Sequence, residues 1–93
     1  MSNIDPRPGR ICISKSGRDA GRVFVIKECI DDQFVYITDG KLRKVDTPKK
    51  KKLKHLELKP QILESLAEKF KEGAKVFDAE VGSALRETDY INK

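Results

Sequence analysis

The chain has little of the chemistry that catalysis and metal binding use. Its 93 residues include no tryptophan, one histidine (His55) and two cysteines (Cys12 and Cys29). The cysteines stand apart instead of forming a CxxC pair, which excludes a zinc knuckle and a thioredoxin-type redox pair. His55 has no serine or cysteine nucleophile at a telling spacing, so general-base catalysis is not supported. We therefore expect no enzyme, no metal site and no cofactor.

Long apolar runs are also missing. No stretch approaches the roughly 18 apolar residues that suggest a membrane helix. Residues 1–10 are polar and hold two prolines, unlike the apolar segment of a secretory signal. We therefore expect a cytoplasmic, reduced protein with no membrane partner, and a disulfide between neighbouring strands stays open as an alternative.

What the chain has in abundance is positive charge in its first part. Lysine and arginine number 20 against 15 aspartates and glutamates, for a formal net charge of +5. Residues 1–60 carry 15 cations and 8 anions, whereas residues 61–93 carry 5 cations and 7 anions. A one-sided positive field raises encounter rates with polyanions, and nucleic acid is the commonest of these. The charge pattern favours a nucleic-acid partner over a protein that is merely soluble.

Five short strands are expected in the first two thirds of the chain. The β-branched and apolar runs predict them at residues 10–14, 22–30, 34–38, 41–46 and 55–58. Asp39-Gly40 is the strongest hairpin signal, because a type I′ turn needs positive φ at both central residues. The lysines at 49–52 repel one another and are expected to stay mobile until an anion arrives. These features predict a small, strongly bent SH3-like barrel over residues 10–59, after a flexible lead-in at 1–9.

The remaining third, residues 60–93, changes to a helical period. Ile62, Leu66 and Phe70 recur four residues apart and predict an apolar stripe on one helix. Pro60 suits a position just ahead of its first turn, and Gly73 suits its end. A second, shorter helix is expected to start near Asp78, whose carboxylate can cap free N–H groups. The predicted class is mainly β with an α tail of two short helices packed on the barrel.

The aromatic side chains are assigned mostly to the core. Tyr36 and Tyr90 are free to be exposed, whereas the four phenylalanines are expected inside: Phe24, Phe34, Phe70 and Phe77. A stacking platform for single-stranded bases needs several surface aromatics. Recognition of folded RNA by shape and phosphate contacts is therefore favoured over base-by-base recognition.

The segment at 16–26, Ser-Gly-Arg-Asp-Ala-Gly-Arg-Val-Phe-Val-Ile, closely resembles the KOW motif, with Gly21 at the position of its defining glycine. The Asp39-Gly40 turn and the run 48–58, Pro-Lys-Lys-Lys-Lys-Leu-Lys-His-Leu-Glu-Leu, extend this likeness over residues 9–59. They resemble the archaeal and eukaryotic large-subunit ribosomal protein family numbered fourteen, together with stand-alone bacterial RNA-binding relatives. The resemblance implies an SH3-like barrel that binds ribosomal or other structured RNA through its loops. The acidic tail differs from the long basic extension of many ribosomal relatives, which leaves an accessory or assembly role open.

Candidate RNA-binding residues fall in three basic groups. Arginine can grip a phosphate with two parallel hydrogen bonds, whereas lysine acts as a point charge. The groups are Lys15, Arg18 and Arg22; Lys41, Arg43 and Lys44; and Lys49, Lys50, Lys51, Lys52 and Lys54. Gly17, Gly21, Asp39 and Gly40 are expected to shape the loops, and His55 has a structural or RNA-facing role.

These observations predict a non-enzymatic RNA-binding module associated with the ribosome or with translation. Its expected partners are RNA, ribosomal RNA above all, and the ribosome or translation factors. The alternative is an SH3-like protein–protein module that serves as an adaptor for transcription or translation factors. A Tudor-like use of the barrel would need three or four exposed aromatics, for which the chain has too few candidates.

Overall fold

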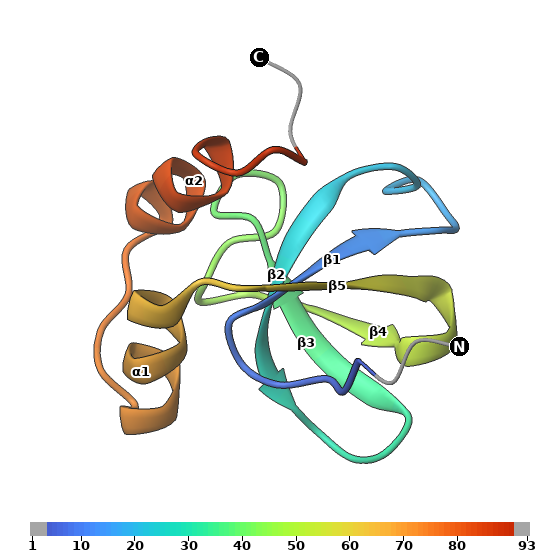
Figure 1. Cartoon of the computed structure of the whole chain (residues 1–93), viewed down its shortest axis with the longest axis horizontal. Coiled ribbons are helices and arrows are strands. Elements are labelled where there is room, and N and C mark those ends of the chain that lie inside the picture. The colour runs from blue at the N-terminus through green and yellow to red at the C-terminus, as the bar shows by residue number, and fades with distance from the viewer. Residues whose placement is uncertain (1–3, 91–93) are drawn as a thin grey trace.

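One antiparallel sheet of five strands carries two helices on one side (Figure 1). The computed structural model describes residues 4–90. The strand order is β4-β3-β2-β1-β5, so β4 and β5 form the edges. The elements are β1 Arg10–Ser14, β2 Val23–Cys29, β3 Phe34–Thr38, β4 Lys49–Lys52, the 3-10 turn η1 Leu53–His55, β5 Leu56–Ile62, α1 Glu64–Glu72 and α2 Asp78–Arg86. The predicted class, a small SH3-like barrel with a helical tail, is confirmed.

Strand β2 is apolar on both faces at its centre, because it separates two hydrophobic clusters. Val23 and Val25 belong to the cluster beneath the helices, which includes Leu66 of α1 and Leu85 of α2. The alternate residues face the barrel interior, where Phe24 and Ile26 join Cys12, Val35, Ile37 and Leu56. Full burial of such a side chain stabilises the fold by about 1.5–3 kcal/mol. The helical tail therefore covers a face of the sheet that would otherwise expose valines.

The prediction of a fourth strand at residues 41–46 is wrong. The structure has turns there, and the strand that pairs with β3 is the lysine run of β4. Asp39 does not take the positive φ of a type I′ turn, since only glycines among the described residues do so. Instead the Asp39 carboxylate accepts hydrogen bonds from the backbone N–H groups of Lys41 and Arg43, at 3.0 and 2.8 Å. These bonds form a wide loop in place of a tight hairpin.

The lysine run of β4 forms a strand, where the sequence favoured a mobile segment. Its four residues pair in register with 34–37 of β3, from Phe34 opposite Lys52 to Ile37 opposite Lys49. Lysines suit an edge strand, because their charge discourages pairing with a further strand from another molecule. Like-charge repulsion along the run is relieved by the alternation of side chains between the two faces.

Strand β5 is longer than expected and ends at Ile62, so Pro60 lies in the strand and not ahead of the helix. Proline is tolerated there because β5 is an edge strand and its register with β1 shifts between Arg10 and Cys12. The buried guanidinium of Arg10 donates hydrogen bonds to the carbonyl oxygens of Lys59 and Pro60, at 3.4 and 2.8 Å. Arg10 therefore fixes the irregular part of this edge.

The ends of the helices agree with the sequence only in part. Gly73 ends α1 in the left-handed conformation, as predicted. Helix α2 begins at Asp78, as predicted, but the Asp78 carboxylate accepts a 2.7 Å hydrogen bond from the N–H of Val45. The prediction that Phe77 lies in the core is wrong, since this residue is 62% exposed. The hydrogen bond from Val45 to Asp78 thus holds the loop that follows β3 against the start of α2.

The described part of the lead-in, residues 4–9, is attached to the fold at Gly9. This buried glycine donates a hydrogen bond to the carbonyl of Ile26 and accepts one from Leu63, both 2.8 Å long. A Cβ at Gly9 would lie 2.6 Å from the Cβ of Ala67. Gly9 therefore belongs to the packed domain, and the flexibility of residues 1–9 stays a prediction.

Candidate nucleic-acid interface

The loop between β1 and β2, residues 15–22, is closed by its own backbone. Gly21 donates to the carbonyl of Ser14 at 2.8 Å, and Ala20 donates to Gly17 at 3.2 Å. Gly17 and Gly21 have φ values of 77° and 86°, which residues with a side chain rarely adopt. The loop thus has a defined shape before any ligand binds.

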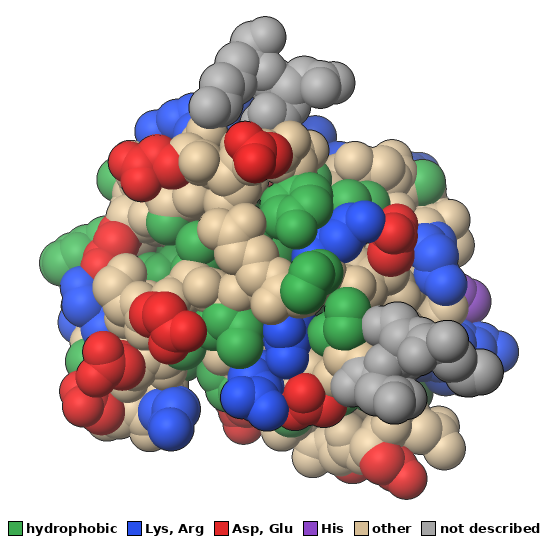
Figure 2. Space-filling model, viewed as in Figure 1, with side chains coloured by type: hydrophobic (Ala, Val, Ile, Leu, Met, Phe, Trp, Pro, Cys, Tyr) green, Lys and Arg blue, Asp and Glu red, His purple; other side chains and the backbone are tan. Residues whose placement is uncertain are grey.

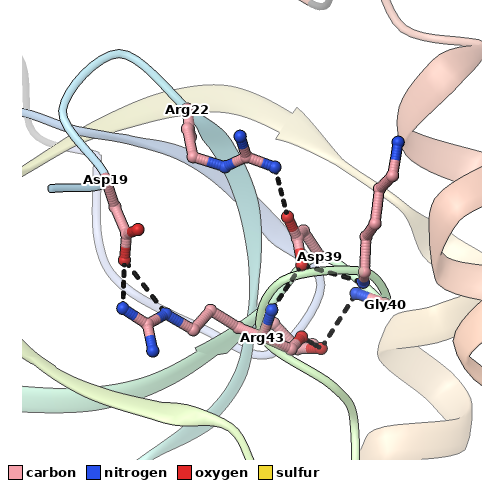
Figure 3. A network of polar contacts seen from close by, with 7 residues as sticks. Asp19, Arg22, Asp39, Gly40 and Arg43 are labelled. Atoms are coloured by element: carbon pink, nitrogen blue, oxygen red, sulfur yellow. Dashed lines mark hydrogen bonds and ion pairs between the residues drawn. The ribbon is translucent and has the colours of Figure 1, made fainter.

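A partly buried ion pair joins this loop to the segment at 39–48 (Figure 3). Asp19 is 3% exposed, and its Oδ2 accepts hydrogen bonds from Nε and Nη2 of Arg43, at 3.0 and 2.9 Å. Within residues 4–90 the other oxygen, Oδ1, has no hydrogen-bond partner. Since the two residues are 24 positions apart, nothing in the sequence pattern predicted that Asp19 would pair with Arg43. This pair fixes the position of the loop relative to the β3–β4 connection.

A second ion pair joins the same two segments, and here the loop supplies the cation and the segment at 39–48 supplies the carboxylate. Arg22 Nη2 lies 3.3 Å from Oδ2 of Asp39, whose side chain is 8% exposed (Figure 3). Asp39 therefore has two tasks, since its other oxygen holds the backbone of the turn that follows. Two of the three basic groups each contribute one arginine to this internal network, and part of the predicted site is structural.

The third basic group meets the same loop from the other side. The Lys51 ammonium donates a 3.2 Å hydrogen bond to the carbonyl oxygen of Ser16. The backbone N–H of Lys15 donates to the carbonyl of His55, at 2.8 Å, at the end of η1. Each of the other two predicted groups consequently has one member in contact with the loop at 15–22, Arg43 in the second group and Lys51 in the third.

Most of the remaining candidates point to solvent, whereas Lys49 is half-buried. Seven of them are exposed and have no ion pair among residues 4–90: Lys15, Arg18, Lys41, Lys44, Lys50, Lys52 and Lys54. Over the two helices, by contrast, several acidic side chains gather at the surface (Figure 2). These seven exposed cations belong to the loops and to the edge of the sheet, whereas residues 61–93 carry more acidic than basic residues, 7 against 5.

A hollow of about 630 Å³ lies beside this network, between the loops and α2. Its wall includes Arg22, Lys41 and Arg86, together with Asp39 and Gly40. Gly40 has a φ of 74°, and a Cβ on it would lie 2.2 Å from the carbonyl oxygen of Asp78. The close contact of Gly40 with α2 therefore fixes one side of the hollow, and three cations line it.

The described residues do not form a metal or redox site. No group of three or more histidine, cysteine or acidic side chains in residues 4–90 could hold a metal ion. Cys12 is a buried free thiol whose pKa is raised by burial from 9.0 to about 12, and Cys29 is free and exposed. No helix within the described residues has the length and apolar character to cross a membrane.

Comparison with known proteins gives a consistent result. No family model matches the chain, so the KOW assignment of residues 16–26 stays a prediction. The chain is 38% identical over 86 residues to the large ribosomal subunit protein eL14 of Desulfurococcus amylolyticus, covering 89% of this chain and 82% of that protein. It is 36% identical to eL14 of Hyperthermus butylicus and 32% identical to eL14 of Metallosphaera sedula. Both matches cover 90% of this chain, and they cover 79% and 80% of those proteins. At this identity over most of both sequences, the chain belongs to the eL14 family of large ribosomal subunit proteins.

Proposed function

We propose that the chain is an RNA-binding component of the large ribosomal subunit that holds structured ribosomal RNA through its phosphates. The observation that carries this proposal is the convergence of three basic groups on the loop at 15–22. Lysine and arginine side chains on a shaped loop can neutralise several neighbouring phosphates at once, which releases counterions and drives binding. Its relatives are named as proteins of the large ribosomal subunit.

The internal ion pairs support a division of labour among the cations. Arg43 and Arg22 hold the loops in place through Asp19 and Asp39. The exposed cations around them, such as Arg18 and Lys44, remain available for phosphates. Because the loops are already positioned, binding costs little ordering entropy. This arrangement suits recognition of a fixed RNA shape.

The proposal places the protein in the cytoplasm, on the ribosome, with no catalytic step. Binding alone needs no nucleophile, acid or base, and His55 is half-buried at the end of η1. Translation factors as partners stay a prediction. The adaptor alternative is not favoured, because the matched relatives are named as ribosomal proteins.

A charge-removal experiment tests the proposal. The double variant Arg18→Gln with Lys44→Gln removes two exposed cations from the basic loops. The matched control, Lys71→Gln with Lys75→Gln, removes two exposed cations from the helical tail. Affinity for a ribosomal RNA fragment is measured by filter binding at a fixed low salt concentration.

We expect the loop variant to bind about tenfold more weakly, and the tail variant to bind as the unmodified chain does. The salt dependence of the loop variant is expected to be shallower by about 0.9 for each phosphate that it no longer neutralises. Equal reductions in affinity for the two variants would mean that net charge alone matters, and they would contradict a site on the loops.

A further inference from the structure

The outer face of β3 and β4 places two aromatic rings beside two lysines. Phe34 lies opposite Lys52 in the register of the two strands, and Tyr36 lies opposite Lys50. Residues two apart on a strand share a face, so these four side chains form one surface. Both rings are partly exposed, whereas Val35 and Ile37 between and beside them point into the barrel. We call this surface the aromatic–lysine face. The prediction that Phe34 lies in the core is therefore wrong, since its ring is partly exposed on this face.

The lysines of this face lie over the ring of Phe34. The distance from Nζ to the ring centroid is 4.7 Å for Lys50 and 5.7 Å for Lys52. An ammonium at this distance is attracted by the negative face of the ring. The contact holds the cations next to a flat, apolar ring. A ring can stack with the base of a nucleotide, and a lysine beside it can pair with the phosphate.

We propose that the aromatic–lysine face binds an unpaired segment of RNA, with bases stacked on Phe34 and Tyr36 and phosphates paired with Lys50 and Lys52. This inference rests on the proposed function and adds a second mode of contact to it. Stacking of a base on an aromatic side chain contributes about 1–3 kcal/mol and tolerates any base, because every base has a π-face. The lysines leave the ring for the phosphates as a base takes their place.

The charges around the face favour a polyanion that follows the edge of the sheet. β4 is the edge strand and contains only lysines. On the opposite side Tyr36 has the exposed Glu28 as its neighbour on β2. A phosphate chain is repelled by Glu28 and attracted by β4, so the RNA segment is expected to cross β3 and β4 and not β2. An acidic peptide would satisfy the lysines but would leave the rings unused.

The tyrosine content of the chain allows a direct test of stacking. The chain has no tryptophan and two tyrosines, so the variant Tyr90→Phe leaves Tyr36 as its only strong fluorophore. Titration of this variant with an oligouridylate, which has little structure of its own, is expected to quench the fluorescence of Tyr36. Quenching should be absent with an abasic oligomer of the same length, which keeps the phosphates but has no base to stack.

Substitution of the second ring completes the test. In the Tyr90→Phe background, Phe34→Leu is expected to weaken oligouridylate binding about tenfold, and Phe34→Tyr is expected to restore it. Phe77→Leu is the matched control, because Phe77 is an exposed ring that also lies near a lysine but on another part of the molecule. Circular dichroism of each variant establishes that the fold is kept, and rescue by Phe34→Tyr separates stacking from folding.

Several outcomes would overturn the inference. One is that oligouridylate does not quench the fluorescence of Tyr36. Another is that the abasic oligomer or polyglutamate binds with the same affinity as oligouridylate. A third is that Phe34→Leu and Phe77→Leu weaken oligouridylate binding equally. A duplex-rich ribosomal RNA fragment distinguishes this failure from failure of the proposed function. Strong salt dependence with the fragment, together with an affinity for oligouridylate that Phe34→Leu leaves unchanged, would support the phosphate-binding loops and contradict stacking on the aromatic–lysine face.

Discussion

The two basic segments of the molecule, the loop at 15–22 and strand β4, are built differently: the loop has three cations and one aspartate, whereas β4 has four lysines. The loop is held by the partly buried pair between Asp19 and Arg43 and by the pair between Arg22 and Asp39. β4 has no such pairs among residues 4–90; its lysines lie on an exposed edge and touch Phe34 and the carbonyl of Ser16. A cation in a basic run can therefore serve stability or binding, and its partners decide which. Substitutions of the residues that hold these loops in place should therefore lower the free energy of unfolding, and substitutions of exposed lysines in β4 should weaken RNA binding.

The largest effect is expected at Gly40, where the connection between β3 and β4 meets α2. Gly40→Ala places a Cβ 2.2 Å from the carbonyl oxygen of Asp78 and forces a side chain to adopt a φ of 74°. We expect destabilisation by about 3 kcal/mol or more, measured by urea unfolding. Gly73→Ala is the control, since Gly73 has a φ of 72° and a Cβ there meets nothing within 4 Å. It should cost about 1–2 kcal/mol. Equal costs would show that the contact with α2 does not hold the β3–β4 connection in place.

Removal of the buried carboxylate should have the next largest effect. Asp19→Ala leaves the Arg43 guanidinium without its partner in the loop. We expect the free energy of unfolding to fall by about 2 kcal/mol, less than for a fully buried pair, because the Arg43 side chain is 30% exposed. The exposed Asp32, in the turn before β3, provides the control Asp32→Ala, which should change stability by less than about 0.5 kcal/mol. A destabilisation at Asp32 as large as the one at Asp19 would contradict the structural role assigned to the pair.

In β4, substitutions are expected to weaken RNA binding with little change in stability. Lys50→Gln with Lys52→Gln should leave the free energy of unfolding within about 0.5 kcal/mol of its original value, because both side chains are exposed. The same variant should weaken binding of ribosomal RNA and reduce its salt dependence. Urea unfolding and filter binding on one preparation measure both effects. A variant that was destabilised and kept its affinity would reverse the comparison between the two segments.

The smallest effect at neutral pH concerns the thiols, which lie outside both basic segments. Burial raises the pKa of Cys12 from 9.0 to about 12, so the folded state keeps the proton that the unfolded state loses. The stability from this thiol is fully present below pH 9.0 and is lost as the pH rises toward about 12. At neutral pH a thiol reagent should label the exposed Cys29 in the native protein and Cys12 only after unfolding. Rapid labelling of both cysteines would mean that the sheet beneath the two segments opens readily.

The sequence predicted the fold well where side-chain pattern and burial agree. Strands β1 and β3, the two apolar faces of β2 and the end of α1 at Gly73 follow from local periodicity and from one glycine. The errors come from partners that are distant in sequence. The hairpin at Asp39 failed because its carboxylate holds the next turn, and Val45 bonds to Asp78, 33 residues away.

The candidate site was predictable as a set of residues but not as an arrangement. Lysine and arginine counts identified the three groups, whereas the pair between Asp19 and Arg43 depends on a fold that local pattern does not specify. Charge alone favours a mobile segment at the lysines of β4, and pairing with β3 decides their conformation instead. Phe34 is only half-buried because it lies on the outer face of β3, opposite Lys52, and its hydrophobicity alone does not indicate which face it takes.

The salt dependence of binding to ribosomal RNA shows directly whether the exposed cations contact phosphates. The observed association constant for a structured ribosomal RNA fragment is measured over a range of salt concentrations, and its logarithm is plotted against that of the salt. If several exposed cations contact phosphates, the plot falls steeply, by about 0.9 for each phosphate neutralised, and the slope is shallower for variants of the basic loops. Binding that ignores salt, or no binding at low salt, would contradict the account.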